Sequence, residues 1–181
     1  MAKQSGRTAK IWRDGELVDW ADANIHVMSH VVHYGSAVFE GMRSYETPQG
    51  GAVFRLREHM RRLQESAKIY ELPLRWTADE LCQATIDTLV ANDAAHCYIR
   101  PIVVRTGEEM GIHAANAPVE TFIICWNWGR SYMPHLQPDG GAKVCVSSWR
   151  RAAPDTFPTM AKASGNYLSS QLAKSEAMRD G

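Results

Sequence analysis

The sequence predicts an α+β fold, because its strand patterns and its helical patterns come in separate runs along the chain. Two hairpin signals come first, two helical patterns follow, and two β-rich runs close the unit near residue 128. These expected elements cover residues 11–20, 42–56, 58–71, 78–91, 97–105 and 121–126.

Turn residues between short apolar runs mark the two hairpins. In the first, Asp14 and Gly15 stand between apolar pairs, and a two-residue turn of this kind needs positive φ at both positions. The second hairpin joins residues 42–45 to residues 52–56 through the turn-rich sequence TPQGG. Between the hairpins, residues 24–41 show no regular period, and we expect them to be irregular.

Apolar periodicity and capping signals predict the two helices. Residues 58–71 repeat apolar side chains at steps of three and four, and Pro73 ends the pattern. This apolar face consists of Met60, Leu63, Ala67 and Tyr70. The second helix opens with the capping box Thr77–Glu80 and extends to about Ala91. One side of it carries Leu81, Thr85, Thr88 and Leu89.

The remaining sequence predicts a linker and the start of a second domain. Residues 129–141 contain two prolines and three glycines, which is typical of an interdomain linker. Beyond them we expect a strand at 142–149 and a helix at about 166–179. One strand and one helix cannot enclose a core, because about 40 residues are too few without further support. We therefore expect residues 1–128 to form a small domain and residues 142–181 an incomplete larger one.

Composition excludes several classes of function. Lysine plus arginine equal aspartate plus glutamate, 20 against 20, so no basic field is present to attract nucleic acid. No apolar run approaches the ~20 residues that span a bilayer, and the N-terminus lacks the apolar core of a signal peptide. The four cysteines are widely spaced, which favours reduced core residues over a disulfide or metal framework. We expect a cytoplasmic protein that binds neither membrane nor metal.

Lys162 is the strongest candidate for a reactive group. It lies among small residues at positions 161 and 163–165, so a large planar group can approach its amine. A lysine that desolvation deprotonates is a nucleophile that forms a Schiff base with a carbonyl. The alternative, on this feature alone, is an ordinary solvated surface charge.

Two groups of arginines suggest anion binding. In a strand, Tyr98 and Arg100 share a face, and together they suit a carboxylate; the alternative is an arginine paired with a structural acid. Arg57, Arg61 and Arg62 crowd the start of a predicted helix, where their charges oppose the macrodipole unless an anion such as phosphate is bound. The alternative for this second group is a solvated basic face.

Aromatic residues and glycines come together in residues 33–43. Gly35 and Gly41 permit close backbone approach to a ligand, and Tyr34 and Phe39 can form an apolar wall, although turn glycines and core aromatics are the alternative. A reactive lysine, a phosphate arginine, a carboxylate site and an apolar wall together suit a pyridoxal-phosphate enzyme that acts on an amino acid.

Long motifs carry a resemblance to a known family. The segments HVMSHVVHYGSAVFEGMR, FRLREHMRRLQESAKIY, YIRP and SSWRRAAPDTFPTMAKASGNYLSSQLAKSEA closely resemble the branched-chain amino acid aminotransferases, which are pyridoxal-phosphate enzymes of fold type IV. The resemblance runs from about Ile11 to Gly181. It implies the small domain of that fold followed by the truncated start of its larger, cofactor-binding domain.

The resemblance also implies roles for individual residues. Lys162 matches the lysine that forms the Schiff base with the cofactor, and Arg62 and Tyr167 match the groups that bind the cofactor phosphate and its phenolic oxygen. Arg100, supported by Tyr98, matches the arginine that receives the side-chain carboxylate of glutamate or 2-oxoglutarate. The aliphatic pocket for leucine, isoleucine or valine is matched by Tyr34, Phe39, Ile112 and Trp128. A homodimer is implied, because some of these positions cross from the other subunit.

The chain departs from the family pattern in two ways. Tyr132 follows Trp128 one position later than the corresponding tyrosine of the family. The chain is also short, and the resemblance places the acid that pairs with the pyridine nitrogen beyond residue 181, so we expect a fragment with little transaminase activity alone. The alternatives are a non-catalytic protein of this fold, a D-amino acid aminotransferase or an aminodeoxychorismate lyase.

Overall fold

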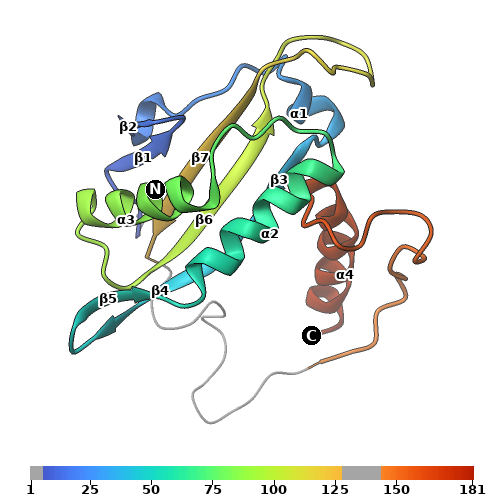
Figure 1. Ribbon diagram of the computed structural model, residues 1–181. Helices are drawn as coiled ribbons and strands as arrows, with labels where there is room; N and C mark the ends of the chain where they lie inside the picture. Colours follow the sequence, from blue (N-terminus) through green and yellow to red (C-terminus); the bar gives the residue numbers. More distant parts are fainter. Residues whose placement is uncertain (1–5, 128–143) are drawn as a thin grey trace.

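An antiparallel sheet forms the centre of the computed structural model, which describes residues 6–127 and 144–181 (Figure 1). Within these residues the sheet has seven strands in the order β2-β1-β7-β6-β4-β5, with β3 paired to β6. The strands are β1 (Lys10–Arg13), β2 (Glu16–Asp19), β3 (Ala37–Phe39), β4 (Met42–Thr47), β5 (Gly50–Val53), β6 (Cys97–Arg105) and β7 (Val119–Trp126). The long pair β6 and β7 runs in continuous register from Tyr98↔Trp126 to Arg105↔Val119.

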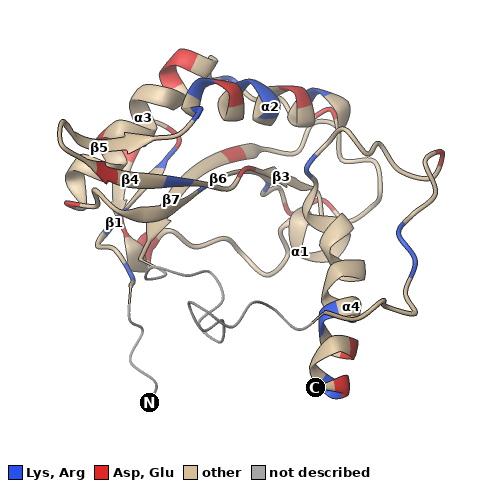
Figure 2. Ribbon diagram, turned by 90° about the horizontal axis from the view of Figure 1, so that it is seen from below, with Lys and Arg blue, Asp and Glu red and all other residues tan. Residues whose placement is uncertain are grey.

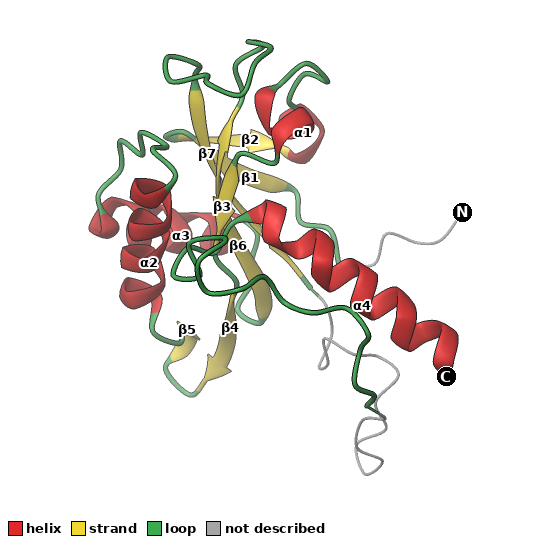
Figure 3. Cartoon of the chain, turned by 90° about the vertical axis from the view of Figure 1, so that its right-hand side faces the viewer, coloured by secondary structure: helices red, strands yellow, loops and turns green. Residues whose placement is uncertain are grey.

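Helices lie on both sides of this sheet. The described α-helices are α1 (His30–Tyr34), α2 (Leu56–Ile69), α3 (Ala78–Ala91) and α4 (Tyr167–Asp180), with short 3-10 turns η1 (Trp20–Asp22) and η2 (Ser164–Asn166). Figure 2 shows α2 and α3 covering one face of the sheet, and Figure 3 shows α4 on the other side. This arrangement confirms the predicted α+β class. None of the helices in the described ranges is both long and apolar enough to cross a bilayer.

Both predicted hairpins form. Asp14 and Gly15 have φ of 47° and 109°, so the turn between β1 and β2 has the predicted backbone. The Asp14 carboxylate also accepts hydrogen bonds from the Trp76 indole at 3.1 Å and the Thr121 amide at 3.2 Å, which fasten the turn to the core. The second hairpin has a shorter turn than predicted, and β5 ends at Val53 because the chain turns into α2 through Arg55, whose φ is 55°.

The two helices also form as predicted, and their apolar faces build the core. Met60, Leu63 and Ala67 of α2 are fully buried against the sheet. Thr77 caps α3 in a complete capping box with Glu80. Thr85 and Thr88 are buried on the inner face of α3, and each hydroxyl donates to the carbonyl four residues earlier. Threonines can therefore occupy this core without an unpaired polar group.

Two regions differ from the sequence prediction. Residues 24–41 were expected to be irregular but contain α1 and β3, which are too short to show a period. The predicted strand at 142–149 is wrong for residues 144–149, which have no strand structure, and Val144 and Val146 are 90% and 99% exposed. In this described part of the chain, no neighbouring strand is available to pair with them. Cys145 is exposed too, so only Cys97 and Cys125 are buried core cysteines.

The last segment confirms the predicted helix as α4, which begins one residue later than expected. In the described part of the chain α4 buries none of its own residues. The segment just before it is attached more firmly, since Ala163 forms a β-bridge with Val38 of β3. The proposed linker at 129–141 lies outside the described residues.

The capping box gives a direct test of the fold. We expect Thr77→Ala to lower the free energy of unfolding by about 1 kcal/mol, because the Glu80 amide loses its hydrogen-bond acceptor. Thr77→Ser keeps the hydroxyl and should remain close to wild type. Urea denaturation followed by circular dichroism measures both, and equal stability of the alanine variant and wild type would contradict the assignment.

Candidate active site

Lys162 lies on a segment that is fixed to two distant elements. Its backbone amide donates to the Ser66 hydroxyl of α2 at 3.1 Å, and its carbonyl accepts from the Phe39 amide of β3 at 3.0 Å. The next residue, Ala163, forms the bridge to Val38. The main chain at Lys162 is therefore held between helix and sheet, while the side chain takes no part in these contacts.

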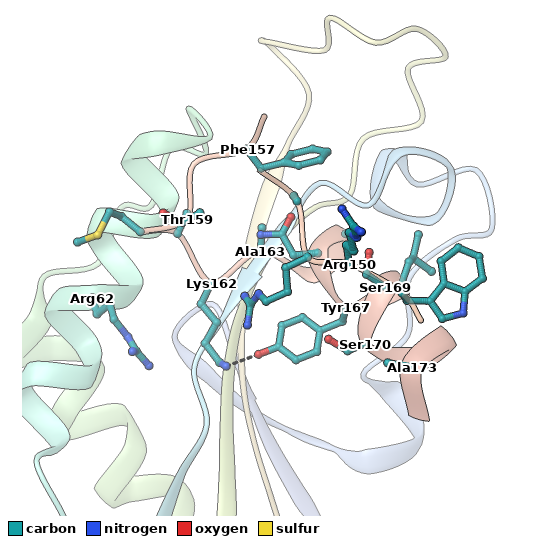
Figure 4. Close-up of a pocket in the computed structure, with 18 residues that line it drawn as sticks. Arg62, Arg150, Phe157, Thr159, Lys162, Ala163, Tyr167, Ser169, Ser170 and Ala173 are labelled. Carbon is teal, nitrogen blue, oxygen red and sulfur yellow. Dashed lines mark hydrogen bonds between the residues drawn. The ribbon is translucent and has the colours of Figure 1, made fainter. Parts of the chain in front are cut away.

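The Lys162 side chain points into an open hollow of about 610 Å³ (Figure 4). Its Nζ donates a hydrogen bond to the Tyr167 hydroxyl at 2.5 Å, and Arg62 lines the same hollow. Three of the small residues around Lys162, namely Ala161, Ala163 and Gly165, also line it. This volume lies within the ~300–1,000 Å³ range of small-molecule sites, so the space that the sequence predicted around Lys162 is present.

Phe39 lies close to both the amine and a second cation. The Lys162 Nζ is 4.8 Å from the centre of the Phe39 ring, and the Arg100 guanidinium is 4.3 Å from it. The Tyr167 ring is 5.0 Å from the same centre. An apolar ring flanked by an amine and a guanidinium can contact an aliphatic group while either cation binds an anion.

Arg100 and Tyr98 lie together on β6, as the strand alternation predicted. Arg100 donates from Nε and Nη2 to the Tyr98 hydroxyl at 3.2 and 2.9 Å. Within the described ranges no carboxylate is paired with Arg100, so the structural-acid alternative finds no support here. Gly41 makes room for this pair, because a Cβ at Gly41 would lie 2.3 Å from the Tyr98 hydroxyl. Trp126, which sequence reasoning missed, packs against the Tyr98 ring with the ring centres 4.8 Å apart and the planes tilted by 50°.

Glu40, a fully buried carboxylate that holds Arg62, was not predicted from the sequence. Arg62 donates to it from Nε and, at 2.6 Å, from Nη2, and the His59 Nδ1 lies 2.9 Å from Oε2. Burial acts to raise the pKa of Glu40, but the hydrogen bonds and charges of Arg62 and His59 outweigh it, and the pKa lies below its ordinary value. Hydrogen bonding to Glu40 also raises the pKa of Arg62. The available signal in the sequence was Glu40 itself, an acidic residue directly after the apolar residues 37–39.

The three arginines at the start of α2 have separate positions. Arg57 forms an ion pair with Asp79 of α3, and Arg61 is not among the residues that line the hollow. Arg62 alone of the three reaches the Lys162 hollow, with its side chain about half exposed. The crowding of charge therefore indicates one candidate anion ligand and not a three-arginine site.

The structure separates the remaining candidates from Lys162. Tyr34 and Ile112 line a second hollow of about 780 Å³, which shares Phe157, Ala163, Gly165 and Asn166 with the first. Both side chains are exposed, Tyr34 at 43% and Ile112 at 87%. Neither is among the residues that line the Lys162 hollow, so a single chain does not bring them to the amine. Trp128 and Tyr132 lie outside the described residues.

Comparison with known proteins supports one family. Residues 37–181 match the family model described as amino-transferase class IV. The branched-chain-amino-acid aminotransferase of Salmonella typhimurium is 48% identical over 172 residues, which are 94% of this chain and 55% of that protein. The corresponding protein of Pseudomonas aeruginosa is 43% identical over 97% of this chain and 57% of its own length. The chain thus spans little more than half the length of these relatives.

Solved structures give the same result. The crystal structure of the Escherichia coli branched-chain amino acid aminotransferase has a TM-score of 0.86 and 46% identity, and the match covers 97% of this chain and 58% of that one. The branched-chain amino acid aminotransferase of Thermobaculum terrenum, solved in its PLP-bound holo form, has a TM-score of 0.82 and 32% identity, and the match covers 97% of this chain and 57% of that one. These neighbours confirm the predicted fold type IV architecture.

The ion pair between the buried Glu40 and Arg62 predicts that the stability of the protein depends on pH. Because the pKa of Glu40 in the folded protein lies below its ordinary value of about 4.5, its contribution is complete above that value and is lost as pH falls through the lowered pKa. We expect Glu40→Gln to lower the free energy of unfolding by about 2 kcal/mol at neutral pH. The difference from wild type should shrink in acid.

Denaturation at a series of pH values measures this difference. Glu46→Gln is a matched control, because Glu46 is exposed and its substitution should change stability little at any pH. A Glu40→Gln deficit that stayed constant down to the acid limit would contradict an ionised Glu40 in the folded state.

Proposed function

We propose, since this chain belongs to the class IV aminotransferases, that it is part of a transaminase that moves amino groups between branched-chain L-amino acids and 2-oxoglutarate. The observation that supports it most is the single hollow in which Lys162, Tyr167 and Arg62 meet, with Phe39 and Arg100 beside it. The match covers only 55% of the Salmonella typhimurium relative, so we propose the reaction for the whole protein.

Pyridoxal 5'-phosphate is the cofactor of this family, and the residues present fit it. The Lys162 amine suits its aldehyde, the Tyr167 hydroxyl suits its ring oxygen, and the half-exposed Arg62 guanidinium suits its phosphate. Glu40 occupies Nε and Nη2 of Arg62 and thereby leaves Nη1 for a further anion. When bound, the cofactor supplies a carbonyl that reacts with amines and a ring that accepts electrons.

Lys162 has two roles in this proposal: it binds the cofactor aldehyde covalently, and it carries a proton to and from the substrate Cα. The amine would serve these roles in turn: its lone pair would bond to the carbonyl carbon, and once the substrate amine had displaced it, the free amine would accept a proton and return it. The Tyr167 hydroxyl at 2.5 Å orients the amine, and the Phe39 ring excludes water from one side of it.

The groups around Phe39 suit two kinds of substrate side chain. A branched aliphatic group can pack on the Phe39 ring, and a side-chain carboxylate can reach Arg100, which Tyr98 holds in place. An apolar wall with one arginine at its rim can therefore accept leucine in one half-reaction and glutamate in the other.

The proposal assigns Tyr34 and Ile112 to the active site of the partner subunit in a homodimer. Both are exposed apolar side chains on a hollow that borders the Lys162 hollow. We propose that each subunit presents them to the aliphatic pocket of its partner, which would account for two pocket residues that do not reach Lys162 in one chain.

Covalent trapping tests the cofactor site. We expect sodium borohydride reduction of the purified protein with pyridoxal phosphate to leave a pyridoxyl group on Lys162, detected by peptide mass mapping. Lys162→Ala should lose the adduct, and Lys174→Ala, which removes an exposed lysine of α4, should keep it. A folded wild-type protein without an adduct at Lys162 would favour the non-catalytic alternative.

Steady-state kinetics of the whole protein, of which this chain is a part, test the substrate site. We expect Arg100→Gln to raise KM for 2-oxoglutarate by about 10- to 100-fold, because a charged hydrogen-bonding partner of the side-chain carboxylate is lost, while KM for L-leucine changes little. Turnover of D-alanine in place of L-leucine would favour a D-amino acid aminotransferase, and equal rises in both KM values would remove Arg100 from its proposed role.

A further inference from the structure

The loop between β6 and β7 exposes the apolar side chain of Ile112. Ile112 stands at its tip with 87% of its surface exposed, and the preceding Gly111 has φ of 146°, which side-chain-bearing residues rarely adopt. An exposed apolar residue is common by itself. Here, however, buried polar side chains hold the main chain on both sides of Ile112.

His30 holds the N-terminal side of the tip. Its ring is buried, and Nε2 lies 2.9 Å from the Gly111 carbonyl, which can only accept, so Nε2 carries the hydrogen. Nδ1 lies 2.7 Å from the Ser36 hydroxyl, and the His30 amide donates to the Gly107 carbonyl at 2.8 Å. The same ring stacks on Tyr34 at 4.5 Å, so one side chain orients both exposed pocket candidates.

Arg105 holds the C-terminal side of the tip. Its guanidinium is buried, with 6% of the residue exposed, and it donates to the carbonyls of Ala114, Ala117 and Glu71. Among the described residues no carboxylate pairs with it, so the charge is compensated by main-chain dipoles alone. Burying an arginine in this way is costly, and it links the loop to the segment that follows α2.

We propose that His30 and Arg105 are positioning residues that fix Ile112, together with Tyr34, as an apolar surface for the aliphatic side chain of the substrate. The inference rests on the proposed function. It extends that function by assigning substrate preference to two buried residues that line the same hollow as Tyr34 and Ile112 and act through the loop.

The proposal makes a selective kinetic prediction for the whole protein. Arg105→Met keeps much of the volume but removes the donors, and we expect KM for L-leucine to rise about tenfold, the equivalent of one charged hydrogen bond. KM for glutamate should stay within about twofold, because Arg100 binds its carboxylate. His30→Gln, which retains a donor for the Gly111 carbonyl, should have a smaller effect than His30→Ala. Arg75→Met is the control, since Arg75 donates to the Asp14 carbonyl away from both hollows.

A double-mutant cycle tests whether Arg105 affects KM for L-leucine through Ile112. If Arg105 acts through the tip, Arg105→Met should add little to the loss caused by Ile112→Ala. Amide hydrogen exchange of residues 107–117 should accelerate in Arg105→Met and remain at the wild-type rate in Arg75→Met.

Three results would overturn the proposal: equal rises in both KM values, full additivity with Ile112→Ala, or faster exchange with an unchanged KM for leucine. Failure of the proposed function is recognised separately, because it would appear as a missing pyridoxyl adduct on wild-type Lys162. In that case the exchange rates alone decide whether Arg105 holds the loop, and an unchanged exchange rate would overturn the proposal.

Discussion

The candidate site depends on the attachment of the Lys162 segment to elements that are far away in the sequence. The Phe39 amide and the Ser66 hydroxyl bind the main chain of Lys162 from the sheet and from α2, and the Val38 bridge adds a third contact at Ala163. These contacts use main-chain groups almost entirely, so the side chain of Lys162 remains available for chemistry. Without them, a segment whose helix α4 buries none of its described residues would have no fixed position relative to Arg62 and Arg100.

Electrostatics explain how Arg62 is held by Glu40 while its side chain also lines the Lys162 hollow. Glu40 is fully buried and would be unstable as an anion unless Arg62 and His59 compensated it. The pairing fixes the orientation of the guanidinium before a ligand arrives, so less conformational entropy is lost on binding. Arg62 thus has one edge committed to the protein interior and another available to the Lys162 hollow.

Local signals in the sequence predicted most of the fold. They could not predict contacts between residues that are far apart in the chain. The Asp14–Gly15 turn, the capping box at Thr77 and the alternation of Tyr98 and Arg100 depend on neighbours in the chain, and all three appear in the structure. Glu40 has its partners 19 and 22 positions away, so no local pattern pairs it with them. The strand predicted at 142–149 does not form at residues 144–149 for a related reason. Strand propensity is a local property, whereas a strand forms only beside another strand that pairs with it.

Residues 39 and 40 connect the two halves of the site. Successive residues of extended chain point to opposite sides, so Phe39 faces Lys162 and Arg100 while Glu40 faces Arg62 and His59. The main chain holds this register through the Phe39 amide to Lys162 and the Glu40 amide to Pro101, at 3.0 and 2.9 Å. A slip of one residue would place a carboxylate beside the Lys162 amine and a phenyl ring beside Arg62. The register of this short stretch therefore fixes both the anion side and the apolar side of the proposed site.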